Sequence, residues 1–95
     1  MTRPEAKATQ MIDDERTRVT RFDFAPGAET GWHTHEMDYV ITTLTDCQMQ
    51  LEHPDGTVTD NNVAAGSVYK RTAGTRHNVI NAGTQDMAFI EVELK

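Results

Sequence analysis

The chain of 95 residues has one cysteine, three prolines and no long apolar run. A single cysteine, Cys47, excludes an intrachain disulfide and a paired-cysteine metal or redox motif. No segment approaches the roughly 18 apolar residues of a membrane-spanning helix. The first ten residues also lack the apolar stretch of a secretory signal. We therefore expect a cytoplasmic protein with no membrane partner.

Positive charge is also scarce, with 9 Lys and Arg against 15 Asp and Glu and a net charge of −6. An acidic chain without a basic run argues against a nucleic-acid partner. It remains compatible with an anionic small ligand, because local charge decides such binding. The length fits one domain with a small core, which gains from burying an interface, so we expect a homodimer.

No segment shows a helical period of useful length. Short segments in which apolar and polar residues alternate are found instead. Apolar and charged residues alternate over 20–24, and again over 47–52 and 88–94. Strands are expected at 17–24, 32–35, 39–44, 47–52, from 57, 67–71, 77–80 and 88–94. The intervening turn signals, every 6 to 12 residues, are typical of an antiparallel sandwich or small barrel. Residues 1–11 carry no clear period and are expected to form a flexible arm or a strand exchanged in a dimer; 12–95 would form the barrel.

The most informative segment is Trp32-His33-Thr34-His35-Glu36-Met37-Asp38. Side chains two apart on a strand share a face, so His33 and His35 can converge on one divalent metal ion. A carboxylate that follows them can complete such a site. His77 is the candidate third ligand, whereas His53 belongs to a predicted turn.

Two glycine-anchored patterns carry a resemblance to a known family. Gly27 precedes His33-Thr34-His35 by five residues, and Gly66 precedes Thr72-Ala73-Gly74, with His77 and Asn81 at fixed distances beyond. Together they resemble the two motifs of the cupin superfamily. The resemblance implies an all-β, antiparallel double-stranded β-helix, the RmlC-like jelly-roll barrel. It also implies that His33, His35 and His77 bind one divalent transition metal, which could be Fe, Zn, Ni, Mn or Co.

The chain departs from the first motif at the expected glutamate ligand, whose position falls at Tyr39 or Val40. Three histidines alone can hold a metal with open positions for water or substrate. A turn tightened by one residue would instead bring in Asp38 as a fourth ligand, and Glu36 is a weaker alternative. Failing that, Asp38 could orient one imidazole. Tyr39 shares the histidines' strand parity and could act near the metal as a hydrogen-bond donor or acid.

Lys70 and Arg71 precede the second histidine motif, and alternation sends one cation inward and the other outward. An inward cation would attract a carboxylate ligand. The competing interpretation is an exposed edge, or a salt bridge across a dimer to Glu91 or Glu93. Trp32 is a candidate pocket residue, with core or interface packing as its alternative.

These residues predict metal-assisted chemistry on a small organic acid. Either Fe(II) activates O₂ as in a dioxygenase, or a Lewis-acid metal acts with Tyr39 or Asp38 in an isomerisation or elimination. The run from Trp32 to Val40 is similar to short cupins assigned to β-alanine degradation. A non-catalytic sensor or carrier on the same barrel is the alternative, so enzymatic activity stays open.

Overall fold

The computed structural model describes residues 2–95, and within them all regular structure is β-strand. This confirms the all-β antiparallel prediction. The nine strands are β1 (Lys7–Asp13), β2 (Thr17–Phe24), β3 (His33–Thr34), β4 (Asp38–Thr43), β5 (Cys47–Glu52), β6 (Val58–Val63), β7 (Val68–Arg71), β8 (Arg76–Asn81) and β9 (Met87–Leu94). No helix in the part of the chain that the structure describes is long and apolar enough to cross a membrane.

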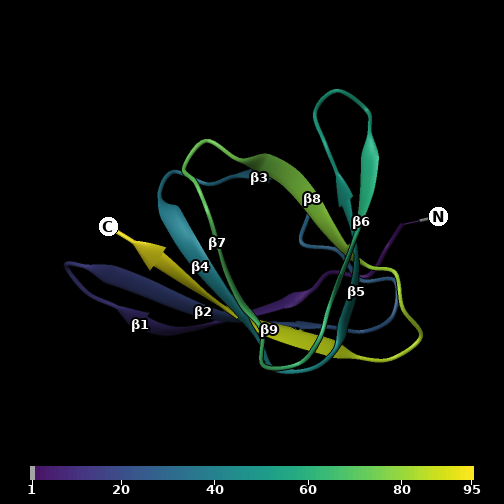
Figure 1. Cartoon of the computed structure of the whole chain (residues 1–95), viewed down its shortest axis with the longest axis horizontal. Coiled ribbons are helices and arrows are strands. Elements are labelled where there is room, and N and C mark those ends of the chain that lie inside the picture. Colours follow the sequence, from purple (N-terminus) through teal and green to yellow (C-terminus); the bar gives the residue numbers. More distant parts are fainter. Residues whose placement is uncertain (1) are drawn as a thin grey trace.

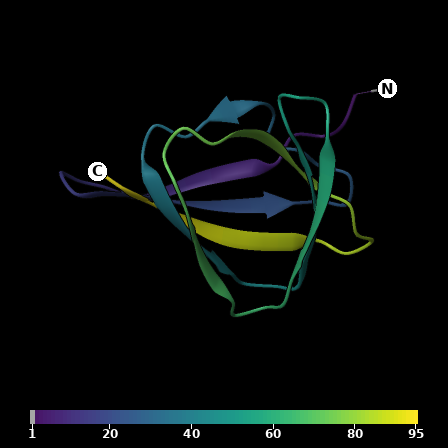
Figure 2. The same cartoon turned by 45° about the horizontal axis from the view of Figure 1, so that its top comes forward.

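Two sheets form the jelly-roll barrel (Figure 1). One has five strands in the order β1-β2-β9-β4-β7, and the other has four in the order β3-β8-β5-β6. All paired strands run antiparallel. Figure 2 shows β1, β2 and β9 lying side by side as one layer of the molecule. Strands far apart in the sequence, such as β2 and β9, are therefore neighbours throughout their length.

Aromatic and aliphatic side chains from both sheets fill the core. The rings of Phe22, Phe24 and Phe89 lie with centroids 5.4 to 6.5 Å apart. Cys47 and Met49 from the opposite sheet are buried against them, and burial raises the pKa of the Cys47 thiol. Burying an aromatic side chain of this kind contributes about 1.5–3 kcal/mol. The small core that the chain length predicts is thus formed between the two sheets.

Glycine conformation and turn hydrogen bonds agree with the motif analysis. Gly27 and Gly66 both have positive φ, at 81° and 79°, which side chains other than glycine rarely tolerate. The buried Asn81 side chain donates hydrogen bonds to the carbonyls of Phe24 and Gln85, as expected of a structural turn residue. The turn at 53–56 joins β5 to β6, and β6 continues through 60–62 because it pairs with β5 along its whole length.

The N-terminal segment is built into the sheet more fully than a flexible arm would be. Ala6 donates to the Glu29 carbonyl, and β1 then pairs with β2 of its own chain. Every residue of β1 is nevertheless exposed. Exchange of this strand between two copies stays a prediction.

The orientation of β9 corrects the sequence analysis in one respect. The alternating sequence of β9 has apolar residues at 88, 90, 92 and 94, the side that would be expected to face the core. In the structure Phe89, Glu91 and Glu93 face the interior instead. Antiparallel partners share a face, and Phe89 pairs with Phe22 while Glu93 pairs with Arg18. The aromatic core and the Arg18 guanidinium therefore set this face inward, although it carries two acids.

Candidate metal centre

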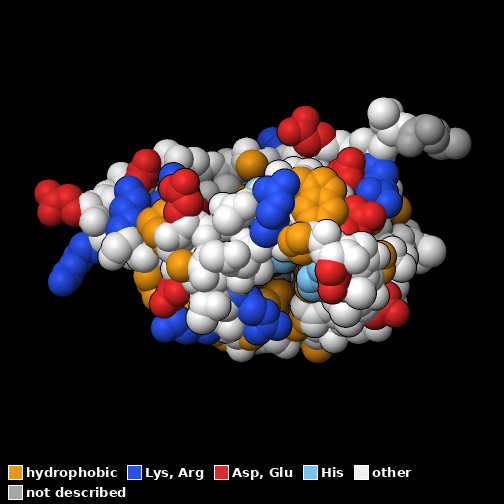
Figure 3. Space-filling model, turned by 90° about the horizontal axis from the view of Figure 1, so that it is seen from above, with side chains coloured by type: hydrophobic (Ala, Val, Ile, Leu, Met, Phe, Trp, Pro, Cys, Tyr) orange, Lys and Arg blue, Asp and Glu red, His pale blue; other side chains and the backbone are white. Residues whose placement is uncertain are grey.

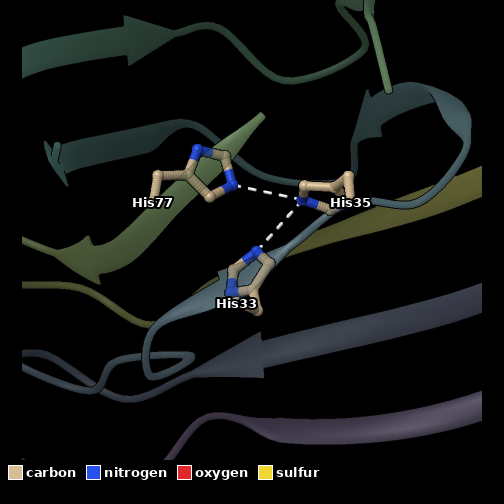
Figure 4. A group of neighbouring side chains, drawn as sticks. All are labelled: His33, His35 and His77. Carbon is tan, nitrogen blue, oxygen red and sulfur yellow. Dashed lines mark hydrogen bonds between the residues drawn. The ribbon is translucent and has the colours of Figure 1, made fainter. Parts of the chain in front are cut away.

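Three histidine side chains converge inside the barrel (Figure 4). His33 on β3 lies directly opposite His77 on β8, and His35 follows β3 with its amide bonded to the Thr75 carbonyl. The Nε2 atoms of His33 and His35 are 3.0 Å apart, and those of His35 and His77 are 3.2 Å apart. The three side chains that the sequence predicted as ligands are thus brought together.

The surrounding chain fixes the orientation of these rings. His33 Nδ1 lies 2.8 Å from the Gly31 carbonyl, an acceptor, so Nδ1 donates and Nε2 presents a lone pair to the centre. The buried Asn78 accepts a hydrogen bond from the Gly31 amide and so holds this loop. The ring of His35 stacks on Tyr39 at a centroid distance of 3.8 Å.

The protonation states favour a bound cation. Burial, reinforced by the neighbouring imidazoles, lowers the pKa of His35 to about 4 and that of His77 to about 3. Both rings are therefore neutral near pH 7, and their facing Nε2 atoms cannot all be satisfied by donating to one another. Two ligand nitrogens about 2.1 Å from one ion and about 90° apart are separated by about 3 Å. The three histidines fit one divalent transition metal.

The structure does not bring Asp38 to this centre. Asp38 faces away from the interior because Tyr39, the next residue on β4, faces inward. Its Oδ1 accepts a hydrogen bond from the Ala73 amide at 2.8 Å and so anchors the loop before β8. The turn between His35 and Asp38 is therefore not tightened by one residue. The site consists of three histidines without Asp38 as a fourth ligand. Glu36 is exposed to solvent.

Tyr39 lies where the sequence analysis placed it, beside the histidines. Its side chain is buried, and its hydroxyl has no hydrogen-bond partner among the described residues. Burial and the nearby Glu91 raise the pKa of Tyr39 to about 12, so the phenol keeps its proton. A buried donor without a partner is costly for folding, and such a group often serves a bound ligand.

Two acids on β9 also reach the centre, and the sequence analysis missed them as site residues. Glu91 Oε1 lies 3.9 Å from His35 Nε2. Glu93 forms a two-pronged pair with Arg18, at 2.8 Å to Nε and 2.9 Å to Nη2. Burial and the adjacent Glu93 raise the pKa of Glu91 to about 7. The sequence did contain a signal for these two acids: Glu91 and Glu93 are two residues apart and lie on the same side of their strand as Phe89.

Two hollows meet at the histidines. The first is a cavity of about 120 Å³, bounded by His33, His77 and Glu91 and otherwise mainly by core side chains. The second is a more open depression of about 280 Å³, bounded by the histidine pair, Arg18 and the two acids of β9. Figure 3 shows histidine side chains reaching the surface close to Lys and Arg side chains. Both hollows give the centre access to small molecules.

Of the predicted ligand-binding residues, Arg71 alone borders a hollow. It pairs with Tyr39 across β4 and β7, lines the first cavity and lies 4.6 Å over the Tyr69 ring. Lys70 points to the opposite side of the same strand and is exposed. Trp32 is 47% exposed, lies under Arg76 and lines neither hollow. His53, predicted as a turn residue, bonds Thr59 and also lines the first cavity.

Comparisons with known proteins agree with this geometry. The family model described as "Cupin domain" matches residues 20–93. The chain belongs to the cupin family. It is 46% identical to the β-alanine degradation protein BauB of Pseudomonas aeruginosa, over 98% of this chain and 97% of that protein.

Solved structures show the same cupin fold. The chain is similar to the crystal structure of a cupin domain from Bordetella pertussis, with a TM-score of 0.95 and 44% identity over 100% of this chain and 98% of that one. It is also similar to the polyketide cyclase RemF of Streptomyces resistomycificus, with a TM-score of 0.73 and 26% identity over 99% and 70% of the two chains.

As a cupin, the chain places its carboxylates unusually. Tyr39 is one of the two residues at which the motif glutamate would fall, and its ring packs on His35. The nearest carboxylate to the histidines comes instead from Glu91, on the last strand. Acid and phenol are thus both present around the three imidazoles, contributed by neighbouring strands.

Proposed function

We propose that this cupin binds one divalent transition metal through His33, His35 and His77 and uses it to transform a small carboxylic acid. The observation that supports the proposal is the convergence of three Nε2 atoms beside a buried Tyr39 hydroxyl that lacks a partner. When bound, the ion would supply Lewis acidity toward a carbonyl or carboxylate oxygen or, as Fe(II), a position for O₂.

Arg71 supports a carboxylate as the substrate's charged group. It borders the cavity, and no acid among the described residues forms a salt bridge with it. A guanidinium can bind a carboxylate through two parallel hydrogen bonds. The apolar walls formed by residues such as Ile41 and Phe89 exclude water from the rest of the ligand. The relative named for β-alanine degradation fits this chemistry, since β-alanine is itself a small carboxylic acid.

Tyr39 and Glu91 support proton transfer, and therefore an isomerisation or elimination. Tyr39 holds a proton that it can donate to a ligand oxygen. Glu91 has no cationic partner at hydrogen-bond distance among the described residues, and a cation bound by the histidines would favour its ionised form, which can accept a proton. Both face the interior from adjacent strands, β4 and β9. These two groups take the roles that the sequence analysis assigned to Tyr39 and Asp38.

A dioxygenase is the second candidate, and a specific observation favours it. Asp38 does not approach the histidines, so three imidazole nitrogens leave several positions around an ion open. An Fe(II) centre needs such positions for both O₂ and substrate.

Metal analysis followed by a substrate screen tests both candidates. We expect close to one transition-metal ion per chain in protein purified without added metal. The metal-loaded protein is then incubated with small carboxylic acids, with and without O₂, and products are followed by NMR. Turnover without O₂ supports isomerisation or elimination, and turnover only with O₂ supports the dioxygenase. Tight binding without turnover would identify a sensor or carrier and overturn the enzymatic proposal.

A further inference from the structure

A buried hydrogen-bond network adjoins the three histidines. Its central member is Asn78, which follows His77 on β8 and is only 1% exposed. A polar side chain buried to this extent is costly unless hydrogen bonds satisfy it. Asn78 meets this requirement with three partners from outside its own strand, Gly31, Glu29 and Glu52.

The orientation of the Asn78 amide is fixed by the chemistry of these partners. Its Oδ1 accepts a hydrogen bond from the Gly31 amide at 3.0 Å. Its Nδ2 donates to one carboxylate oxygen each of Glu29 and Glu52, both at 2.7 Å. A backbone N–H only donates and an ionised carboxylate only accepts, so a flipped amide would lose all three hydrogen bonds.

Gly31 connects this network to a metal ligand. Its amide donates to Asn78, and its carbonyl accepts from Nδ1 of His33 at 2.8 Å. The φ angle of Gly31 is 85°, a conformation in which a residue with a side chain would be strained. A neutral imidazole with its proton on Nδ1 has its lone pair on Nε2, the atom that faces His35. Asn78 therefore holds the residue whose carbonyl selects the metal-binding form of His33.

Two carboxylates and one arginine hold the other end of Asn78. The Nη1 atom of Arg3 lies 3.0 Å from Glu29 and 3.3 Å from Glu52, at the same oxygens that accept from Asn78. Without a cation between them, two carboxylates this close would repel each other. The hydrogen bonds from Asn78 and Arg3 keep the pKa of Glu29 below its ordinary value, so this acceptor stays ionised.

Backbone hydrogen bonds bring Arg3 to this position. The amide of Glu29 donates to the carbonyl of Pro4, and the amide of Ala6 donates to the carbonyl of Glu29. The start of the described chain therefore runs beside the segment that leads to His33, on the side of the molecule where β5 and β8 lie (Figure 1). A side chain near the start of the sequence is thereby connected to a metal ligand by a continuous series of hydrogen bonds.

We infer that Asn78 is a positioning residue of the candidate metal centre and that Arg3 supports it from the surface. The inference rests on the proposed function, because a fixed tautomer of His33 matters only if His33 binds an ion. When Asn78 is removed, Gly31 loses its anchor and the form of His33 with its proton on Nε2 becomes populated. That form offers no lone pair to the ion, so metal affinity falls.

Calorimetric titration of the metal-free protein with Zn²⁺ measures the effect on affinity. We expect Asn78→Ala to bind Zn²⁺ about 10- to 100-fold more weakly than wild type. Asn81→Ala is the matched control, because Asn81 is also 1% exposed and lies on the same strand, but donates to the carbonyls of Phe24 and Gln85. We expect it to lower stability and leave the affinity of the folded protein unchanged. An equal loss of affinity in both variants would assign Asn78 a purely structural role and overturn the inference.

Arg3→Ala keeps the inference testable if Asn78→Ala does not fold, since the Arg3 side chain is 43% exposed. We expect it to weaken Zn²⁺ binding about three-fold, because it removes only the outer partner of the two carboxylates. Arg21→Ala is its control, because Arg21 is equally exposed, at 43%, and forms a surface salt bridge with Asp23 on the five-stranded sheet. Equal affinities of these two variants would overturn the inference for Arg3.

Nitrogen-15 NMR of the metal-free protein at pH 8 separates this inference from the proposed function. The ring nitrogens of His33 report which of them carries the proton. We expect the proton on Nδ1 in wild type and in Asn81→Ala, and a substantial population with the proton on Nε2 in Asn78→Ala. If the wild-type protein binds no Zn²⁺, the proposed function fails, whereas this measurement still decides whether Asn78 sets the tautomer. The same His33 tautomer in wild type and Asn78→Ala would overturn the inference.

Discussion

The two sides of the candidate metal centre differ in the chemistry of their side chains. The β3–β8 side contributes imidazoles that are neutral near pH 7 because burial lowers the pKa of His35 and His77. The β9 side contributes two buried acids, of which Glu93 is neutralised by Arg18 and Glu91 has no cationic partner at hydrogen-bond distance among the described residues. One side therefore offers lone pairs to a cation. The other offers a carboxyl group whose charge is stabilised only if a cation binds nearby.

Removing two of the three histidines should have the largest effect on metal binding. We expect the double variant His33→Ala, His77→Ala to lose metal binding completely, because two of three converging nitrogens disappear. Metal content by elemental analysis measures this. The metal-free variant should still fold, since the phenylalanine core and the strand pairings do not use these two side chains. Unfolding of the variant would mean that the histidines serve the core.

The acidic side should affect stability in a pH-dependent way. Glu91 has a pKa of about 7 in the folded protein and about 4.5 when unfolded, so the folded state binds the extra proton between these values. Its contribution to stability is full below pH 4.5 and is lost as pH rises through 7. Because a shift of this size corresponds to about 3 kcal/mol, the stability of Glu91→Gln relative to wild type should increase as pH rises from 4.5 to 7 and stay constant above pH 7.

Urea unfolding of the metal-free protein with chelator, at pH 5 and pH 8, measures this difference. Glu36→Gln is the control, because Glu36 is exposed to solvent. A Glu91→Gln difference that does not change with pH would contradict the burial of an unpaired carboxyl.

Tyr39 lies between the two sides, and its phenol should serve the reaction rather than the fold. We expect Tyr39→Phe to retain metal and stability, because the hydroxyl has no partner to lose. Turnover of a substrate found in the screen should fall about 100-fold if the phenol is a general acid. Steady-state kinetics beside a thermal melt separates the two outcomes. Unchanged turnover would assign Tyr39 to ring packing on His35 alone.

Asp38 should give the smallest effect. In Asp38→Asn the amide oxygen can still accept the hydrogen bond from Ala73, so stability should change by less than about 1 kcal/mol. Metal affinity, measured by titration calorimetry, should stay within a few-fold of wild type. A large loss of affinity would mean that Asp38 moves into the centre when metal binds.

Much of the fold and the three histidines of the candidate metal centre could be predicted from the sequence, whereas its two acids could not. Alternation predicted most of the strands, and positive-φ glycines at Gly27 and Gly66 were predictable because turns there require them. The pairing of β1 with β2 of its own chain and the full length of β6 were not predicted, because both strands are mostly polar segments stabilised by pairing rather than by their own pattern.

The sequence by itself determined that His33 and His35 share a side, because the strand period is two, and that His77 follows at motif spacing. Only the tertiary structure decided which side of β9 faces inward. Both sides of β9 carry apolar residues, so alternation alone is ambiguous. Pairing of β9 between β2 and β4 placed Glu93 between Arg18 and Tyr39, and thereby brought Glu91 to the histidines. The His33–His35 pair is local in origin, whereas the approach of His77 and of the two acids depends on contacts between distant strands.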